Sequence, residues 1–254
     1  MSIKSKVLAA AATLTLVGGV GAAGVLGAST ASAATPSCGG HCINLFSLQF
    51  GTHTTPSYVV DVLRQGEKTG QPIILFRQAN YDQAEDWTVA YQGKVSDFYA
   101  AGLVSASVNL HYGCNSISNA CTTDYPNDPA FENEYAPFGV DSGLCMGVAA
   151  TAFNGEGVTL QPCGVSSKTV WIADIFDSPS TVFSGYVPLI NGSDTNFSQP
   201  FVLTYPNGSV PTDKPRAQLV VDNITGFSQG FPPGPELGTV DDNQLWGIDT
   251  GVLN

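Results

Sequence analysis

The chain has 254 residues, with 9 Lys and Arg against 21 Asp and Glu, which gives a formal net charge of −12 and a pI near 4.3. This charge makes nucleic acids, phospholipid headgroups and acidic sugars poor partners, and it favours a neutral or basic ligand. Charged residues make up only 12% of the chain and aromatic residues 10%, which excludes a disordered chain and predicts a folded domain with a buried core.

The first 33 residues have the features of a cleaved secretory signal peptide. Lys4 and Lys6 precede an apolar stretch over residues 7–26, and residues 31–33 (Ala-Ser-Ala) supply the small side chains that signal peptidase needs. A retained membrane anchor is the alternative, but this stretch is mostly Ala and Gly and is followed by a cleavage site. We therefore expect a secreted protein that makes no membrane contact once the signal is removed.

All six cysteines follow the predicted cleavage point. An even number of cysteines in an oxidising compartment predicts three disulfides. Short separations favour pairing of neighbours. The expected pairs are Cys38 with Cys42, Cys114 with Cys121, and Cys145 with Cys163. A metal site at Cys38 and Cys42 is the alternative, but no second ligand cluster follows at zinc spacing, so we expect neither a metal nor a cofactor.

The remaining chain is predicted to be all-β and to contain one unit three times. Short alternating apolar runs are broken by Gly, Pro, Asn and Asp, and no stretch keeps helical periodicity for three turns. Residues 43–87, 131–171 and 186–246 each read as three strands that end at a tryptophan. The tryptophans are expected core residues, with ligand stacking as the alternative. They are Trp87, Trp171 and Trp246.

The second and third strands of each unit follow from the same pattern, with a turn marked by Gly or Pro between them. They are residues 58–62 and 73–76 in the first unit, 144–148 and 158–161 in the second, and 201–205 and 217–221 in the third. A unit this small cannot bury its apolar face alone. Three units must share one core, which predicts a barrel with pseudo-threefold symmetry that hairpins close at one end.

Parts of the second and third units resemble a known family. Residues 143–148, 157–163 and 169–171 look like one repeat of a ricin-type β-trefoil lectin. Residues 244–246 (Gln-Leu-Trp) match the Gln-x-Trp signature of that family, whereas residues 85–87 (Glu-Asp-Trp) and 169–171 (Thr-Val-Trp) keep only its tryptophan.

The resemblance implies a single β-trefoil domain over residues 34–254, with repeats at about 43–108, 131–180 and 186–254. Cys145 with Cys163 matches the within-repeat disulfide of the family. Residues 109–130 and 222–242 exceed the usual loop length and are expected to be insertions.

Sugar recognition in this family uses a carboxylate, an aromatic ring and a nearby amide. The first unit has Asp61 at the carboxylate position and Phe76 at the ring position, with Ala84 and Glu85 in place of the amide pair. The corresponding positions hold Gly147 and Gln161 in the second unit. In the third they hold Thr204 and Val220, beside the amides Asn243 and Gln244.

The expected ligand-binding residues are therefore concentrated in the first unit. They are Asp61, Phe76, Asn80, Glu85, Asn243 and Gln244. The alternative is that Asp61 satisfies turn amides beside Gly66 and that Phe76 is an ordinary core or surface aromatic residue. In the resembled family the glutamine at the Gln244 position mainly braces its own repeat.

Catalytic interpretations are weaker. His41 and Ser142 lie in segments similar to those of chymotrypsin-like proteases, but the glycines that shape the oxyanion loop are missing. Acidic pairs such as Glu132 with Glu134, or Asp241 with Asp242, are typical of solvated surface charge rather than of a glycosidase. We expect a protein that is not an enzyme and binds neutral carbohydrate. The alternative is a trefoil that binds protein through its long loops, as a protease inhibitor does, or a structural secreted protein.

Overall fold

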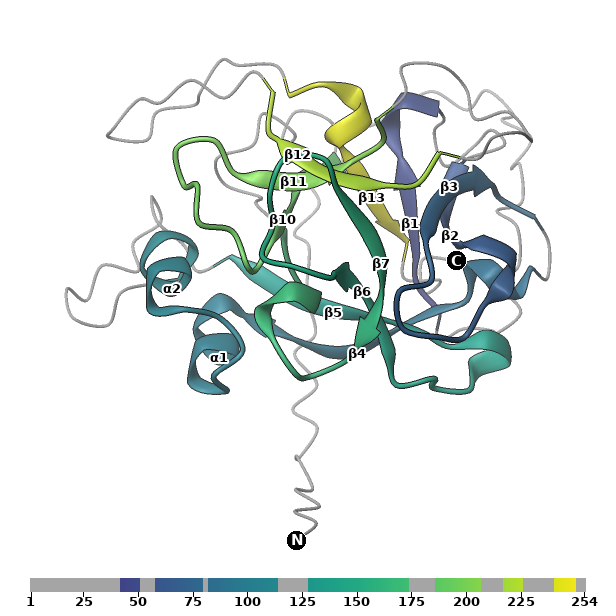
Figure 1. Cartoon of the computed structure of the whole chain (residues 1–254), viewed down its shortest axis with the longest axis horizontal. Helices are drawn as coiled ribbons and strands as arrows, with labels where there is room; N and C mark the ends of the chain where they lie inside the picture. The colour runs from purple at the N-terminus through teal and green to yellow at the C-terminus, as the bar shows by residue number, and fades with distance from the viewer. Residues whose placement is uncertain are drawn as a thin grey trace, which may run out of the picture. The chain divides into compact units, whose positions relative to one another are not determined.

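The computed structural model describes seven stretches of the chain: residues 42–50, 58–79, 82–113, 128–173, 186–206, 217–225 and 240–249. The predicted signal peptide, Cys38, Asn80, Cys114 and Cys121 lie outside these ranges. Strands dominate the described residues, which confirms the all-β prediction (Figure 1).

Seven of the described strands follow one another around a ring, and the pairs among them are antiparallel. In order around the ring they are β1 (Asn44–Ser47), β13 (Trp246–Asp249), β9 (Tyr186–Val187), β10 (Leu189–Asn191), β8 (Val170–Ala173), β5 (Pro129–Tyr135) and β4 (Trp87–Lys94). β9 and β10 follow one another along the chain, and a bridge between Ile43 and Trp87 joins β4 to the start of β1. The ring is therefore a barrel whose strands come from all three predicted units.

The other six strands form three hairpins. These are β2 (Tyr58–Val62) with β3 (Ile73–Arg77), β6 (Leu144–Val148) with β7 (Glu156–Pro162), and β11 (Phe201–Thr204) with β12 (Val220–Asn223). Their second strands also meet one another. Pro72, just before β3, bridges to β7, Ile74 of β3 bridges to Gln218 just before β12, and β7 pairs with β12. Each hairpin is thus held by the other two.

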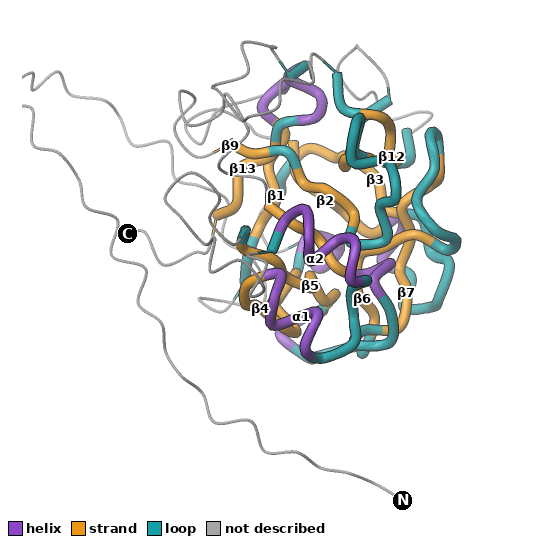
Figure 2. The backbone as a smooth tube through the Cα atoms, turned by 90° about the vertical axis from the view of Figure 1, so that its left-hand side faces the viewer, coloured by secondary structure: helices purple, strands orange, loops and turns teal. Residues whose placement is uncertain are grey.

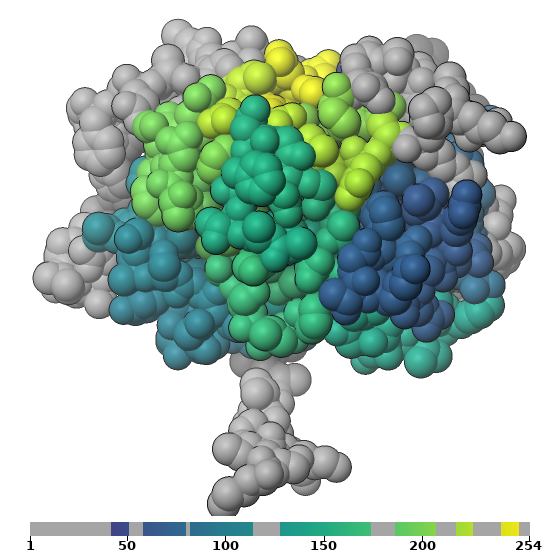
Figure 3. Space-filling model, viewed as in Figure 1, coloured from purple at the N-terminus to yellow at the C-terminus, as the bar shows by residue number. Residues whose placement is uncertain are grey.

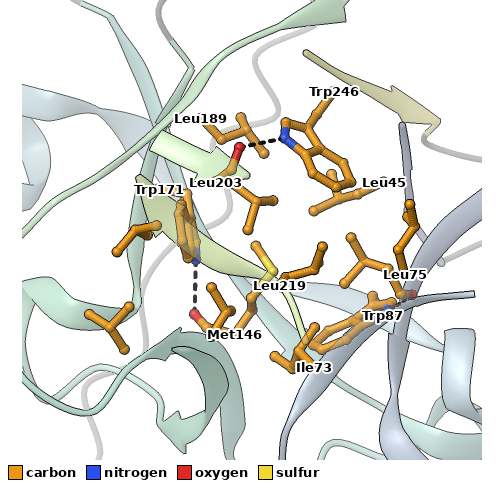
Figure 4. Close-up of a cluster of buried hydrophobic side chains, with 14 of the residues drawn as sticks. Leu45, Ile73, Leu75, Trp87, Met146, Trp171, Leu189, Leu203, Leu219 and Trp246 are labelled. Atoms are coloured by element: carbon orange, nitrogen blue, oxygen red, sulfur yellow. Dashed lines mark hydrogen bonds between the residues drawn. The ribbon is translucent and has the colours of Figure 1, made fainter. Parts of the chain in front are cut away.

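The three tryptophans occupy the same place in each unit (Figure 4). Each is fully buried in one apolar cluster and donates its indole N–H to a backbone carbonyl of the hairpin strand in its own unit. The bonds join Trp87 to Val60 at 3.0 Å, Trp171 to Met146 at 2.9 Å and Trp246 to Leu203 at 2.8 Å. The prediction that these residues are core, rather than stacking platforms, is confirmed.

A short 3-10 turn precedes every one of these tryptophans. The turns are η4 (Gln83–Glu85), η6 (Ser167–Thr169) and η8 (Asp242–Gln244), and each ends two residues before the tryptophan. The residue between turn and tryptophan accepts a backbone hydrogen bond in all three places, from Ala136, Gly192 and Leu48 respectively. Glu85, Thr169 and Gln244 are therefore equivalent positions.

Two short helices after β4 were not predicted. They are α1 (Val95–Ala100) and α2 (Ala106–Tyr112), which lie side by side (Figure 2). Lys94 donates its backbone N–H to Asp97, and Ser105 accepts that of Val108, so side chains cap both helices. Their apolar residues join a second cluster with Val202 of the third hairpin and with four barrel residues, Ala130, Val170, Ile172 and Ile190.

The predicted strands match β2 and β6 to the residue and lie within β3 and β7, but the prediction for β12 is wrong. Strand β12 begins at Val220, whereas the sequence pattern predicts a strand from Ala217. The register of β12 matters for the site because it decides which side chains share a face.

Cys145 and Cys163 form a disulfide, as predicted. Cys42 is also disulfide-bonded, and its partner lies outside the described residues. None of the helices in the described ranges has both the length and the apolar character of a membrane span.

Candidate functional site

The first hairpin places Asp61 and Phe76 on the same face. Asp61 pairs with Ile74, and Val59 pairs with Phe76, so these four side chains alternate with those that enter the barrel core. The core-facing residues are Val60, Val62, Ile73 and Leu75. We call the opposite side, made of Val59, Asp61, Ile74 and Phe76, the first-hairpin face. Val59, Asp61 and Ile74 are each at most 1% exposed and Phe76 is half-buried, so this face is open only at Phe76. Figure 3 shows the blue segment that includes β2 and β3 at the molecular surface.

Three carboxyl groups gather at the Asp61 end of this face. Asp61, Asp82 and Glu85 each offer an oxygen, and these oxygens lie within 4.8 Å of one another. Asp61 is 1% exposed and Glu85 3%, whereas Asp82 is partly exposed. Asp82 is therefore the member of the group that water or a ligand reaches most easily.

The turn η4 brings Asp82 and Glu85 to Asp61. Asp82 caps the turn by accepting the N–H of Ala84 at 3.0 Å, and it also accepts a side-chain N–H of Gln65 at 3.1 Å. Glu85 accepts the N–H of Ala79 at 2.8 Å. The spacing of Asp82 and Glu85, three residues apart, is typical of a capping segment and could have identified Asp82 from the sequence.

The electrostatics of the group favour a protonated Glu85. Burial raises the pKa of Glu85 to about 9; the N–H of Ala79 lowers this pKa, and Asp61, Asp82 and Asp86 raise it. Tyr135 adds a buried hydroxyl, whose pKa burial raises, with further increases from Glu67, Asp86, Asp61 and Asp82.

Phe76 lies at the other end of the face and is half-buried. Because Phe76 is two residues from Ile74, the direct partner of Asp61, ring and carboxylate are diagonal neighbours across the hairpin. The structure thus brings together Asp61, Phe76 and Glu85 of the predicted site. The prediction for Asn80 falls outside the described residues.

The equivalent faces of the other two hairpins lack this combination. Gly147 pairs with Thr159 and is followed by Gln161, as predicted for the second unit. In the third, Thr204 pairs with Val220, so the position that matches Phe76 is Asp222 and not Val220. The sequence alignment missed this position because the strand starts three residues later than its apolar pattern indicates.

Asn243 and Gln244 form bonds within their own unit. Asn243 donates its side-chain N–H to the carbonyl of Tyr205 at 2.9 Å. The Gln244 amide donates to Thr204 Oγ1 at 3.1 Å and to the carbonyl of Asn223, and its oxygen accepts the N–H of Thr225. Gln244 is 1% exposed, which supports its bracing role over direct ligand contact.

The acidic pair on β5 also serves the fold. Glu132 accepts the N–H of Gly164 and the hydroxyl of Thr169, and Glu134 accepts the N–H of Gly143. Both carboxylates are buried, so the prediction that this pair is solvated surface charge is wrong. Burial raises the pKa of Glu134. Their hydrogen bonds anchor the turns on either side of the Cys145–Cys163 disulfide.

No family model and no curated protein matches the sequence. Among solved structures, the chain is similar to the designed 3-fold symmetric protein ThreeFoil, at 13% identity and a TM-score of 0.45 over 81% of this chain and 96% of that one. A mosquitocidal holotoxin matches at 11% identity and a TM-score of 0.46, over 82% of this chain and 17% of the toxin. The C-half of an earthworm R-type lectin, solved with GalNAc, matches at 14% identity and a TM-score of 0.39 over 82% and 96% of the two chains.

Proposed function

We propose that the chain is a β-trefoil that binds neutral carbohydrate through the first-hairpin face and catalyses no reaction. The fold proposal is supported by the recurrence, in all three units, of a hairpin, a 3-10 turn and a buried tryptophan bonded to its own hairpin. The proposal of export, with residues 1–33 removed, is supported by the disulfides at Cys42 and between Cys145 and Cys163.

One observation carries the proposed binding function. Of the three equivalent hairpin faces, all of them described at these positions, only the first combines an aromatic ring with a carboxylate at its diagonal neighbour. A sugar needs both, because the apolar face of the pyranose stacks on the ring while its hydroxyls donate to carboxylate oxygens. Asp82, as the partly exposed carboxylate, is the direct acceptor in this proposal, and Asp61 lies behind it.

The crowding of the carboxylates supports binding over hydrolysis. A retaining glycosidase holds its two carboxyl groups about 5–5.5 Å apart, on either side of the bond that it cleaves. Here the three groups approach within 4.8 Å, and Asp61 and Glu85 are almost wholly buried. Only Asp82 is open to a substrate, whereas hydrolysis needs two accessible carboxyl groups.

The test is binding to an array of neutral and acidic glycans, followed by calorimetry on any neutral hit. Phe76→Ala removes the stacking surface and should weaken binding about tenfold, and Asp82→Asn should weaken it by a similar factor. Gln161→Ala is the matched control, since Gln161 occupies the position of Phe76 in the second hairpin.

Three results would contradict the proposal. They are equal affinity in Phe76→Ala and the wild type, a preference for acidic glycans, and release of reducing sugar from a bound oligosaccharide. Binding should also change little with ionic strength, because the ligand carries no charge. Capture of a protease in place of a glycan would favour the protein-binding alternative.

A further inference from the structure

We propose that Glu85 is held as a neutral carboxylic acid beside the Asp61 carboxylate, and that loss of its proton in alkaline solution disrupts the first-hairpin face. The O–H of neutral Glu85 is a hydrogen-bond donor in the first unit, as the side-chain N–H of Gln244 is in the third. The protonation of Glu85 requires no ligand. Only its consequence for sugar binding rests on the proposed function.

The equivalence of the three units provides the main argument. The indole of each unit bonds to the carbonyl just before Asp61, Gly147 or Thr204, so these three residues correspond. The residue two places before each tryptophan lies against this position. Gln244 donates to Thr204 Oγ1 at 3.1 Å, and a Cβ added to Gly147 would come within 2.9 Å of Thr169 Cγ2.

The first unit has an acid at both of these positions. Asp61 and Glu85 have carboxylate oxygens within 4.8 Å of each other and are 1% and 3% exposed. Two ionised carboxylates at such a distance, away from water, repel each other strongly, and one proton between them removes the repulsion. A protonated Glu85 has the O–H donor that matches the N–H of Gln244.

The surrounding groups add further negative charge. Asp61 belongs to β2, and Asp82 and Asp86 flank η4 on either side. Tyr135 of β5 contributes a hydroxyl that stays neutral. Turn η3 (Leu63–Gln65), which packs on η4, contributes Gln65 to Asp82, while its Arg64 is exposed. Glu67, beyond η3, is exposed and also acts on Tyr135. The raised pKa of Glu85, about 9 with burial as its largest cause, agrees with this arrangement.

The first experiment compares wild type with Glu85→Gln by urea unfolding from pH 5.5 to 8.5. The native state holds a proton that the unfolded state has lost over this range, so the wild type should lose stability as the pH rises. We expect the ratio of the wild-type unfolding equilibrium constant to that of Glu85→Gln to increase about tenfold for each pH unit. Equal slopes for the two proteins would overturn the proposal.

Glu156→Gln is the matched control. Glu156 also accepts an alanine N–H from six residues earlier, that of Ala150 at 3.3 Å, but from a more open position. The pH dependence of the unfolding free energy should be the same in Glu156→Gln and in the wild type. Infrared spectra in D2O at neutral pH give an independent measurement: a protonated carboxyl band should be present in the wild type and weaker in Glu85→Gln. Its absence from the wild type would overturn the proposal without any need for a variant.

A calcium titration tests the competing explanation of the acidic cluster. A cation bound by Asp61, Asp82 and Glu85 would require all three to be ionised at neutral pH. Stabilisation of the wild type by calcium, lost in Glu85→Gln, would therefore overturn the proposal, and no change in the melting temperature is the expected result.

The last arm measures sugar affinity from pH 7 to 10.5. Wild-type affinity should fall above about pH 9, where Glu85 ionises, while Glu85→Gln should keep its affinity. Parallel profiles would overturn the alkaline disruption of the face. Absence of binding in both proteins at every pH would instead refute the proposed function, and the unfolding and infrared measurements would still decide the state of Glu85.

Discussion

Replacement of each tryptophan by phenylalanine tests whether the three units are physically equivalent. Trp87, Trp171 and Trp246 are each 0% exposed and donate one indole hydrogen bond of 2.8–3.0 Å. Phenylalanine removes that bond, which costs about 1 kcal/mol. It also leaves a residual cavity of roughly 40 Å³, which costs about 1 kcal/mol at ~24 cal/mol per Å³. Each variant should therefore lose about 2 kcal/mol.

Urea unfolding with fluorescence or circular dichroism gives the free energy directly. For a protein of this size, the same loss lowers the melting temperature by about 4–8 °C. Tyr91→Phe, at a ring that is 36% exposed, is the control and should change stability by less than about 0.5 kcal/mol. If one tryptophan variant matched the wild type while the other two lost stability, the three units would not be equivalent.

Two further substitutions test the packing around the first two hairpins. Gly147→Ala would place its Cβ 2.7 Å from the backbone carbonyl oxygen of Lys168. It should cost about 1–3 kcal/mol in thermal unfolding, and an unchanged melting temperature would contradict this contact. Tyr135→Phe removes a hydroxyl that is buried and has no hydrogen-bond partner among the described residues. It should raise the free energy of unfolding by about 1 kcal/mol, whereas a loss of that size would reveal a partner for the hydroxyl.

The sequence predicts the strands and the core of this protein better than it predicts helices α1 and α2. Burial on one face gives a strand its alternating pattern, so β2 and β6 could be located to the residue. The tryptophans could be assigned to the core because each repeat needs a large apolar anchor. Helices α1 and α2 have six and seven residues, too few to establish a helical period, and capping side chains rather than periodicity define their starts.

The site was predictable only in part, for a different reason. Asp61 and Phe76 follow from strand positions, but Asp82 reaches the site through a turn, and turn geometry leaves a weaker trace in the sequence. The assignment of Asp222 depended on the register between β11 and β12. Val220 and Asp222 are two residues apart and lie on the same face of the hairpin, so only the register shows which of them is the diagonal neighbour of Thr204. The state of Glu85 could not be read from the sequence, since it depends on burial and on three nearby carboxyl groups.

A second binding face can be built on the third hairpin if the first-hairpin geometry is sufficient for binding. Thr204→Asp with Asp222→Phe would reproduce the Asp61 carboxylate and the diagonal ring. Asp241, which precedes η8 as Asp82 precedes η4, already supplies the exposed carboxylate. Gln244, which now donates to Thr204 at 3.1 Å, is placed to donate to the new carboxylate, and an amide needs no added proton to do so.

Calorimetry should then give two sugars per chain in place of one, and the new site should keep its affinity at alkaline pH. Thr204→Asp alone is the control and should leave the stoichiometry at one, because it lacks the ring. A double variant that folds with normal stability and still binds one sugar would show that residues beyond the carboxylate, the ring and the bracing side chain are needed for recognition.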